Sequence, residues 1–324
     1  MRVLILGAAG MVGRKLAASL LADPVLGADT VDHLTLADAV VPEAVGAAPV
    51  TVDAVASDIA DPDAVARLVT GRPDLVVHLA AVVSGEAEAD FDKGYRVNLE
   101  GTRHLLEAIR REGAGAPYRP RVVFASSIAV FGTPFPDRIG DTFLQAPLTS
   151  YGTQKAIGEL LLADYSRRGL LDGIGLRLPT ICVRPGAPNK AASGFFSSIL
   201  REPLAGHQAV LPVGEEVRHW FASPRAAVGF LRHAATLDLS RLGPRRSLSM
   251  PGLSATVGEQ IAALRRAAGE AAVRLIRRVP DPAIAAIVAG WPRDFDAARA
   301  EALGFRAERS MDEIVRAHLE DEGR

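Results

Sequence analysis

Residues 3–13 read Val-Leu-Ile-Leu-Gly-Ala-Ala-Gly-Met-Val-Gly, and the architecture of the chain can be worked out from them. Four apolar residues have the pattern of a buried strand, and a helical pattern follows over residues 10–21. The glycines between them let a turn close tightly and let a pyrophosphate approach the backbone, where a helix N-terminus offers free N–H groups. The segment therefore predicts a phosphate-binding turn, and the alternative is a tight turn that binds nothing.

Strands and helices continue to alternate beyond this turn. Further strands are predicted over residues 34–37, 50–55, 75–79, 122–125 and 175–178, and helices from residue 61 and over 95–111 and 150–167. This alternation predicts an α/β fold, a Rossmann-type doubly wound parallel sheet. After Pro179 the rhythm changes to Pro- and Gly-rich segments, with helices over 254–268, 281–288 and 311–319. We expect a cofactor-binding domain over 1–180 and a smaller substrate-binding domain over 181–324, parts of which return to the sheet.

Composition narrows the classes of function. The 324 residues include 48% hydrophobic and 23% charged residues, with 37 basic and 38 acidic side chains. A net charge of −1 predicts neither a nucleic-acid partner nor binding to an anionic membrane. A single cysteine, Cys182, excludes an internal disulfide and a cysteine-rich zinc module, and we predict no metal site. The apolar runs are too short for a signal peptide or a membrane span, so we expect a soluble cytoplasmic protein.

The second predicted strand ends in Asp38. A carboxylate at this position can accept hydrogen bonds from both ribose hydroxyls of a dinucleotide, and it would repel a 2′-phosphate. We therefore predict NAD as the cofactor. Arg14, beside the glycine turn, is the argument for NADP, although a solvated helix residue is the plainer interpretation. Asp38 as an ordinary loop aspartate is the other alternative.

Further cofactor contacts are predicted at the ends of the next strands. Asp58 and Ile59 follow the third strand, where an adenine ring would lie, and small residues after the fourth strand would allow close approach of the cofactor. Asn98 in the following helix would brace the site through backbone contacts. The full predicted set around the turn and strand ends is Gly7, Ala9, Gly10, Met11, Val12, Asp38, Asp58, Ile59, Leu79, Ala80, Ala81 and Asn98.

Tyr151 and Lys155 lie four residues apart on a predicted helix and therefore share a face. A free tyrosine, with a pKa of about 10, is a poor base at neutral pH. A neighbouring ammonium would lower that pKa, and about 3 units, or about 4 kcal/mol, would bring it near 7. Ser127 ends the fifth strand at the carboxyl edge of the sheet, where ligands bind. We predict Ser127, Tyr151 and Lys155 as the catalytic residues, with Lys155 also holding the nicotinamide ribose.

Together these residues resemble the extended short-chain dehydrogenase/reductase family over essentially the whole chain. Gly7, Gly10 and Gly13 match the family's cofactor glycines, and Ser127, Tyr151 and Lys155 match its catalytic residues. The resemblance implies that the loop with Pro179, Thr180 and Ile181 contacts the nicotinamide carboxamide. It also implies a homodimer in which the helices over 95–111 and 150–167 pair with their symmetry copies. The apolar residues proposed for core and interface are Leu105, Leu106, Ile109, Leu160, Leu161 and Leu162.

Within the family, the chain is most similar to a dehydrogenase branch that oxidises a four-carbon sugar acid. The implied reaction converts the C2 hydroxyl to a 2-oxo group: Tyr151 takes the hydroxyl proton, and Ser127 holds the hydroxyl. Arg218 falls where relatives hold an anionic group, and its planar fork suits a carboxylate. Arg177 and Arg184 are interpreted as structural. The predicted substrate contacts are Ser84, Ser127, Tyr151, Thr180, Asn189 and Arg218.

Two other functions remain open from the residues. A nucleotide-sugar epimerase or dehydratase would use the same catalytic set, although family members of that kind commonly carry an aromatic residue and Asn after the sixth strand, where this chain has Pro179 and Thr180. A non-catalytic NAD-sensing protein is the second alternative, and an intact Ser127, Tyr151 and Lys155 set argues against it.

Overall fold

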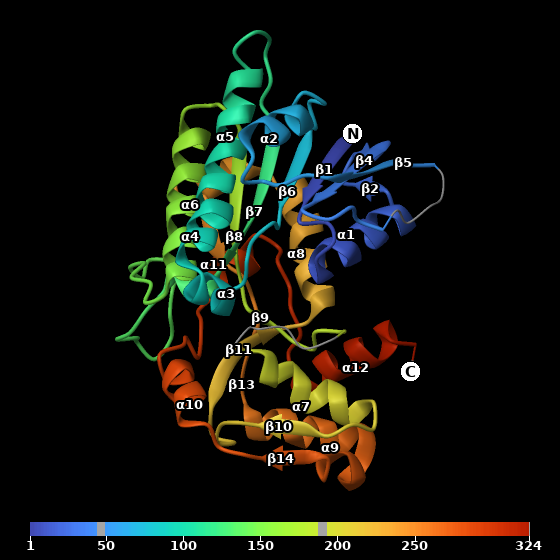
Figure 1. The fold of residues 1–324 in the computed structure, drawn as a ribbon, viewed down its shortest axis with the longest axis vertical. Helices are drawn as coiled ribbons and strands as arrows, with labels where there is room; N and C mark the ends of the chain where they lie inside the picture. Colours follow the sequence, from blue (N-terminus) through green and yellow to red (C-terminus); the bar gives the residue numbers. More distant parts are fainter. Residues whose placement is uncertain (44–48, 187–192, 324) are drawn as a thin grey trace.

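A seven-stranded parallel sheet forms the larger lobe of the computed structural model, which describes residues 1–43, 49–186 and 193–323 (Figure 1). The strands in spatial order are β12 (Ser247–Ser249), β8 (Asp172–Leu178), β7 (Arg121–Ser127), β6 (Leu75–His78), β1 (Arg2–Leu6), β4 (His33–Asp38) and β5 (Thr51–Ala56). All six strand pairs are parallel. The predicted α/β fold class is confirmed.

The order of the strands reverses at β1. From β1 the chain runs outward through β4 and β5 on one side, and later through β6, β7, β8 and β12 on the other. Crevices at such a reversal, beyond the carboxyl ends of the strands, are where open α/β sheets bind their ligands. The glycine turn directly after β1 therefore occupies the switch point of the sheet.

Helices cover both faces of the sheet, because the side chains of each strand point alternately to the two sides. In β1, Val3 and Ile5 pack into one apolar cluster and Leu4 and Leu6 into another. One face is covered by α1 (Met11–Ala22) and α8 (Pro224–Thr236), and the other by α2 (Pro62–Val69), α5 (Gly101–Glu112) and α6 (Ser150–Arg167).

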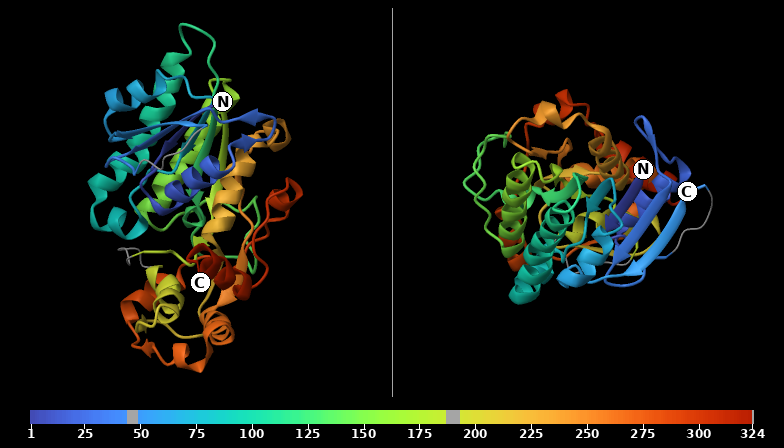
Figure 2. Two further views of the ribbon diagram at one scale, coloured as in Figure 1. Left: turned by 90° about the vertical axis from the view of Figure 1, so that its right-hand side faces the viewer. Right: turned by 90° about the horizontal axis from the view of Figure 1, so that it is seen from above.

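The smaller lobe lies below the carboxyl edge of the sheet (Figure 2). Its core contains Phe196, Ile199 and Leu264. Its helices are α7 (Gly194–Leu204), α9 (Val257–Val273), α10 (Pro282–Ala289) and α12 (Met311–Asp321). Its strands are β10 (Ala209–Leu211), which pairs with β14 (Ile276–Arg278), and β11 (Arg218–Ala222), which lies between β9 (Thr180–Ile181) and β13 (Leu253–Thr256). Between these segments the chain returns to the larger lobe as α8 and β12, so no single boundary separates the two lobes in sequence.

Shorter elements complete the fold. They are β2 (Val25–Leu26), β3 (Asp29–Thr30), α3 (Ser84–Ala89), α4 (Phe91–Gly94), α11 (Ala298–Ala302), a π-helical segment (Tyr95–Glu100) and two 3₁₀ turns (Ile128–Val130 and Leu239–Leu242). Among the described residues, no helix is long and apolar enough to cross a membrane.

Two predicted helices differ in their first turns. The helix expected over 95–111 begins as the π-helical segment Tyr95–Glu100 before α5. The helix expected from residue 254 begins at Val257, because Ser254 to Thr256 pair with β11 as part of β13. Thr256 then caps α9, since its side chain accepts from the Glu259 N–H while the Glu259 carboxylate accepts from the Thr256 N–H. Strand β13 has four residues, too few to show the period of a strand, so the sequence pattern assigned its last three residues to the helix.

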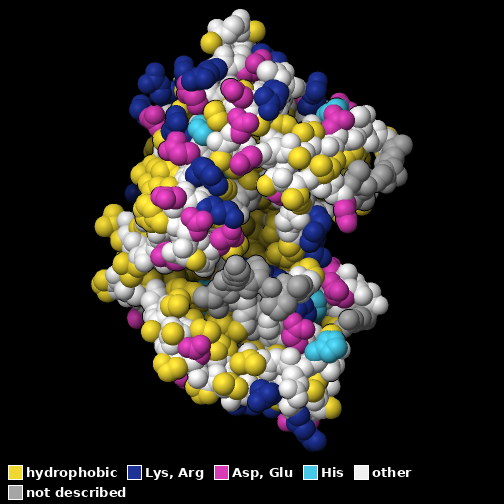
Figure 3. All heavy atoms as spheres, in the orientation of Figure 1, with side chains coloured by type: hydrophobic (Ala, Val, Ile, Leu, Met, Phe, Trp, Pro, Cys, Tyr) yellow, Lys and Arg dark blue, Asp and Glu magenta, His cyan; other side chains and the backbone are white. Residues whose placement is uncertain are grey.

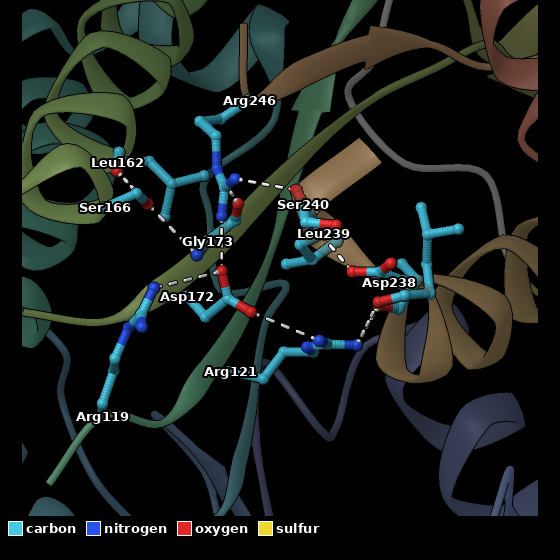
Figure 4. A network of polar contacts seen from close by, with 12 residues as sticks. Arg119, Arg121, Leu162, Ser166, Asp172, Gly173, Asp238, Leu239, Ser240 and Arg246 are labelled. Atoms are coloured by element: carbon cyan, nitrogen blue, oxygen red, sulfur yellow. Dashed lines mark hydrogen bonds and ion pairs between the residues drawn. The ribbon is translucent and has the colours of Figure 1, made fainter. Parts of the chain in front are cut away.

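Asp172 anchors the amino edge of the sheet, away from the glycine turn (Figure 4). Its carboxylate binds Arg246 at 2.5 Å and Arg121 at 3.3 Å. Arg121 also donates to the carbonyl of Leu237 at 2.7 Å, just after α8. The network therefore ties β7 and β8 to the end of a helix that covers the sheet.

Candidate active site

The glycine turn leaves the N-terminus of α1 open toward the cleft between the lobes. Gly7 has φ +88°, and a Cβ at this position would lie 2.6 Å from the Ala80 nitrogen, so only glycine allows this approach of β1 to β6. Gly10 precedes α1 and provides no side-chain cap, so the first N–H groups of the helix are available to an anion. We call the turn from Gly7 to Gly10, together with the N-terminus of α1, the glycine cradle. The cradle fits the pyrophosphate of a dinucleotide.

Asp38 lies beside the turn, as predicted. Its Oδ2 accepts from the Ala9 N–H at 2.9 Å, and its Oδ1 accepts from the Ala39 N–H at 2.7 Å. The carboxylate is thus fixed at the end of β4, next to the strand that leads into the cradle. A carboxylate at this strand end can accept hydrogen bonds from ribose hydroxyls, and Asp38 itself does not line the cavity described below. Arg14, interpreted as a solvated residue, is exposed and also lines the cavity described below.

A cavity of about 570 Å³ extends from the glycine turn to the smaller lobe. In the space-filling view a hollow with hydrophobic walls opens between the two lobes (Figure 3). The predicted site residues that line the cavity are Gly7, Gly10, Met11, Val12, Leu79, Ala81, Ser84, Ser127, Tyr151, Lys155, Pro179, Thr180 and Ile181. One continuous space therefore joins the predicted cofactor cradle to the predicted catalytic residues.

Six predicted cofactor residues do not line the cavity: Ala9, Asp38, Asp58, Ile59, Ala80 and Asn98. Three of them, Asp58, Ile59 and Ala80, have structural contacts within the fold. Ala80 packs against Gly7, and Ile59 is 6% exposed in the core that contains α2 and α5. Asp58 accepts from the Ala60 N–H at 2.9 Å and shapes the turn after β5. The structure places all three near strand ends but brings none of them to the cavity.

Asn98 braces the site, and it does so through residues that contact the cavity. Its Oδ1 accepts from the Val82 N–H at 2.8 Å, and its Nδ2 donates to the Val82 carbonyl at 3.2 Å and to Gln154 Oε1 at 2.7 Å. Val82 lines the cavity, and Gln154 precedes Lys155 in α6. Asn98 therefore positions Val82 and Gln154 and does not itself line the cavity, and no sequence pattern had pointed to Gln154.

Ser127 and Tyr151 meet at the centre of the cavity. Ser127 ends β7, where its Oγ accepts from the Ala129 N–H at 3.1 Å, and its hydroxyl is close enough to the Tyr151 phenol to lower the pKa of that phenol. Tyr151 lies in the first turn of α6, which Thr149 caps by accepting from the Gly152 N–H at 3.0 Å. The serine and the phenol can therefore both contact one substrate oxygen.

Lys155 is 2% exposed, one helical turn from Tyr151. Its Nζ donates to the Ala125 carbonyl at 2.8 Å and lies 5.8 Å from the centre of the Tyr151 ring. Burial lowers the pKa of Lys155 to about 8, although Glu159 opposes this effect. The amine is thus held in the cavity wall by the strand that carries Ser127.

The electrostatics of Tyr151 differ from the prediction. Burial raises the pKa of Tyr151 above its ordinary value, and the charge of Arg184 and the hydrogen bond with Ser127 lower it only in part. In this structure the cation acting on the phenol is Arg184, whereas the expected cation was Lys155. Because the phenolate loses its water when buried, one nearby cation does not bring the pKa to neutrality.

Arg184, interpreted as structural, lines the cavity. Its Nε donates to the Ile181 carbonyl at 3.2 Å, and its backbone is held by α7. Ser197 Oγ accepts from the Arg184 N–H at 3.0 Å, and Arg201 donates to the Arg184 carbonyl at 2.7 Å. This fixes a cation near the phenol.

Arg218, predicted to hold the substrate carboxylate, does not line the cavity. Its guanidinium donates to the Ser254 carbonyl at 3.0 Å and lies 3.4 Å from Glu259. The next residue of β11, His219, lines the cavity instead. Neighbouring residues of a strand point to opposite faces, and the face of β11 that meets the cavity carries His219 and not Arg218. Asn189 lies outside the described residues.

A buried ion pair connects the strands and the helix that surround Ser127. Glu159 and Arg177 pair at 2.7 Å, and both are less than 10% exposed. Ser126 donates to Glu159 Oε1 at 2.5 Å, and Gln145 donates to Oε2 at 2.6 Å. Arg177 is structural, as interpreted from the sequence, and the network joins β7, β8 and α6 next to the predicted catalytic residues.

A family model described as the NAD dependent epimerase/dehydratase family matches residues 3–238. The chain belongs to this family. The predicted resemblance is thereby confirmed, and NAD is the cofactor of the protein, which is an NAD-dependent oxidoreductase. The glycine cradle and Asp38 are the residues of this family member that fit NAD.

Two relatives cover nearly the whole chain. A protein from Cupriavidus necator named D-erythronate dehydrogenase is 48% identical over 327 residues, covering 100% of this chain and 99% of the relative. A protein of the same name from Haemophilus influenzae is 42% identical and covers 99% of each chain. A crystal structure described as the nucleoside-diphosphate-sugar epimerase from Agrobacterium tumefaciens is 62% identical, with a TM-score of 0.97, covering 99% of this chain and 94% of that one.

Proposed function

We propose that this family member oxidises the C2 hydroxyl of a four-carbon sugar acid, D-erythronate, to a 2-oxo-tetronate with NAD. The observation that carries the proposal is the meeting of Ser127 and Tyr151 in the cavity that also holds the glycine cradle and Arg184. The two relatives named D-erythronate dehydrogenase support the same substrate.

Ser127, Tyr151 and Lys155 are the residues of the chain that act in this reaction. Ser127 and Tyr151 hold the C2 oxygen, and the Tyr151 phenolate takes the hydroxyl proton as the C2–H bond breaks. Bound NAD supplies the acceptor for the hydride and a positive charge close to the phenol. The protonated amine of Lys155 lies next to Tyr151, because its Nζ is held in place by the Ala125 carbonyl.

Arg184 is the proposed partner of the substrate carboxylate, in place of Arg218. The carboxylate of a 2-hydroxy acid is bonded directly to the carbon that is oxidised, so its partner must lie near Tyr151. Arg184 is close enough for its charge to act on the pKa of that phenol. In a nucleotide sugar the diphosphate is farther from the reacting carbon, so a cation at this position suits an acid better.

A nucleotide-sugar epimerase is the second candidate, because the 62% identical crystal structure carries that description. The experiment supplies the full chain with NAD and either D-erythronate or a UDP-hexose, and follows absorbance of the reduced cofactor. We expect reduction of NAD with the acid alone, because an epimerase returns its hydride to the sugar. Absence of reduction with any C4–C6 sugar acid, together with conversion of the UDP-hexose, would overturn the proposal.

Tyr151→Phe separates catalysis from simple binding. Removing the general base should lower kcat about 10²- to 10⁴-fold, while the Kd for NAD should stay nearly unchanged. An unchanged kcat would remove Tyr151 from the mechanism. If the wild-type protein binds NAD and turns over neither class of substrate, the chain acts as an NAD-binding protein.

We also propose that the protein is a homodimer joined through α5 and α6. Leu105, Leu106, Ile109 and Leu162 are at most 1% exposed, so they pack inside the protomer and cannot serve an interface. Leu160 on α6 is 64% exposed, which leaves an apolar side chain on the outer face of this helix pair. A small hydroxy acid is the only further partner that we propose.

A further inference from the structure

His219 connects the cavity wall to the segment after α10. The ring is 2% exposed and lines the cavity, with Nδ1 2.8 Å from the Pro292 carbonyl and Nε2 2.7 Å from the Thr180 hydroxyl. Both ring nitrogens are therefore engaged, and Thr180 itself lines the cavity beside Pro179 and Ile181.

Aromatic side chains enclose this ring. Phe196 stacks on His219 with ring centres 5.2 Å apart and planes at 4°, and the rings of Phe221 and Trp291 lie 5.5 and 5.3 Å away. Burial lowers the pKa of His219 to about 4. At neutral pH the imidazole is therefore uncharged and carries one ring proton, on one nitrogen only.

The partners of the ring decide which nitrogen carries that proton. A carbonyl oxygen only accepts hydrogen bonds, so Nδ1 must carry the proton and donate to Pro292. Nε2 is then a bare lone pair, and the Thr180 hydroxyl must donate its one proton to it. The remaining polar capacity of the Thr180 hydroxyl is that of an acceptor.

We propose that His219 fixes Thr180 as a hydrogen-bond acceptor and thereby selects substrates with a hydroxyl on the carbon next to the one oxidised. This inference rests on the proposed function and deepens it. With the carboxylate at Arg184 and the C2 oxygen at Tyr151, the C3 hydroxyl is the next group that can reach the wall. An acceptor attracts that hydroxyl and repels a carboxylate, so a 2,3-dihydroxy acid is preferred to a 3-deoxy-2-hydroxy acid.

The first test compares kcat/KM for a 2,3-dihydroxy acid with kcat/KM for its 3-deoxy analogue. Thr180→Val removes the hydroxyl at nearly constant volume and should reduce this ratio about ten- to hundredfold, while Thr180→Ser should preserve it. An unchanged ratio in Thr180→Val would overturn the proposal. An equal loss of affinity for NAD would overturn it too, because the hydroxyl would then serve the cofactor carboxamide.

His219 variants test the positioning role with a matched pair. In His219→Gln the amide oxygen reaches the position of Nε2 and keeps an acceptor for Thr180, whereas in His219→Asn the amide reaches only the position of Nδ1. Both variants lose the stacked ring, so stability should fall in both. The substrate ratio should fall about tenfold further in His219→Asn than in His219→Gln, and equal ratios would contradict the positioning role.

A direct measurement does not depend on the substrate. Nitrogen NMR of the full chain with ¹⁵N-labelled histidine reports which ring nitrogen carries the proton, and His219→Gln assigns the signal. We expect protonated Nδ1 and bare Nε2 at pH 7, and the reverse tautomer would overturn the inference. If this tautomer is found and the wild-type protein oxidises no sugar acid, the proposed function fails, and the inference about substrate choice fails with it. If the protein oxidises the acids without regard to the 3-hydroxyl, only the further inference fails.

Discussion

Arg184 and Arg218 differ in what surrounds each guanidinium. Arg184 is held inside the cavity wall by contacts with Ile181, Ser197 and Arg201, whereas Arg218 is 42% exposed next to Glu259. A charge pair formed with substrate in a desolvated site contributes far more than one at an exposed position. The two arginines therefore provide a matched test of where the carboxylate binds.

Arg184→Gln should raise KM for the sugar acid at least tenfold, because the substrate carboxylate would then lack its cation. Arg218→Gln, the control, should leave KM within about twofold, because its ion pair is exposed. Steady-state kinetics at saturating NAD gives both values. A large rise in KM for Arg218→Gln with none for Arg184→Gln would mean that Arg218 on β11 binds the substrate carboxylate.

The pKa values of Tyr151 and Lys155 predict the shape of the pH profile. Because burial raises the pKa of Tyr151 above its ordinary value, the phenolate is scarce at neutral pH, and its fraction grows about tenfold with each pH unit. The ammonium form of Lys155 is lost as pH rises through its pKa of about 8. If both forms are required, kcat/KM should rise about tenfold per pH unit up to about pH 8 and then level.

Measuring kcat/KM between pH 6 and pH 10 tests this prediction, since kcat/KM reports the ionisation of the free enzyme. A profile that is flat from pH 6 to pH 8 would mean that Tyr151 is already ionised there. In that case the cations of the site would have overcome the desolvation of the phenolate.

Helix α6 positions Tyr151 through a close contact with the turn after β7. A Cβ at Gly152 would lie 2.2 Å from the Ala129 carbonyl oxygen, so the first turn of the helix packs directly on backbone. Tyr151 and Ser127 belong to the two segments joined here. Any widening of this contact would separate the phenol from the serine hydroxyl.

Gly152→Ala should therefore lower kcat at least tenfold and reduce Tm, because a displacement of about 1 Å at a reacting group can cost a factor of a hundred. Gly229→Ala on α8 is the control, since a Cβ there meets nothing within 4 Å. Alanine favours a helix over glycine by about 1 kcal/mol, so this variant should be as stable as the parent or more stable. Thermal unfolding and kinetics of both variants check the prediction, and a fully active Gly152→Ala would refute it.

The assembly prediction concerns the outer face of α5 and α6. Leu160→Glu would place a charge on the exposed face of α6 proposed for the interface, so light scattering should show a dimer for the parent chain and a monomer for the variant. Leu144→Glu is the control, because Leu144 is 76% exposed and lies outside both helices. A dimer that persists in Leu160→Glu would place the interface elsewhere, and a monomeric parent chain would exclude it.

Local patterns were sufficient for most of the sheet and for the helix that carries Tyr151 and Lys155. The predicted helix over 150–167 coincides with α6 (Ser150–Arg167), and six strands of the central sheet were anticipated. Strand β12, with three residues, was missed because it has too few residues to show a period. The π-helical start before α5 was also missed, although it carries Asn98 to Val82, because sequence periodicity does not separate π from α turns.

The amino-acid sequence was enough for the glycine cradle, Asp38 and the chain positions of Ser127, Tyr151 and Lys155, because each follows from a strand end or a helical spacing of a few residues. The three-dimensional packing decided that Arg184 and His219 line the cavity while Arg218 does not, and that burial raises the pKa of Tyr151. These features depend on which face of β11 meets the cleft and on how much water is removed around a phenol, and both arise from contacts between segments far apart in the chain.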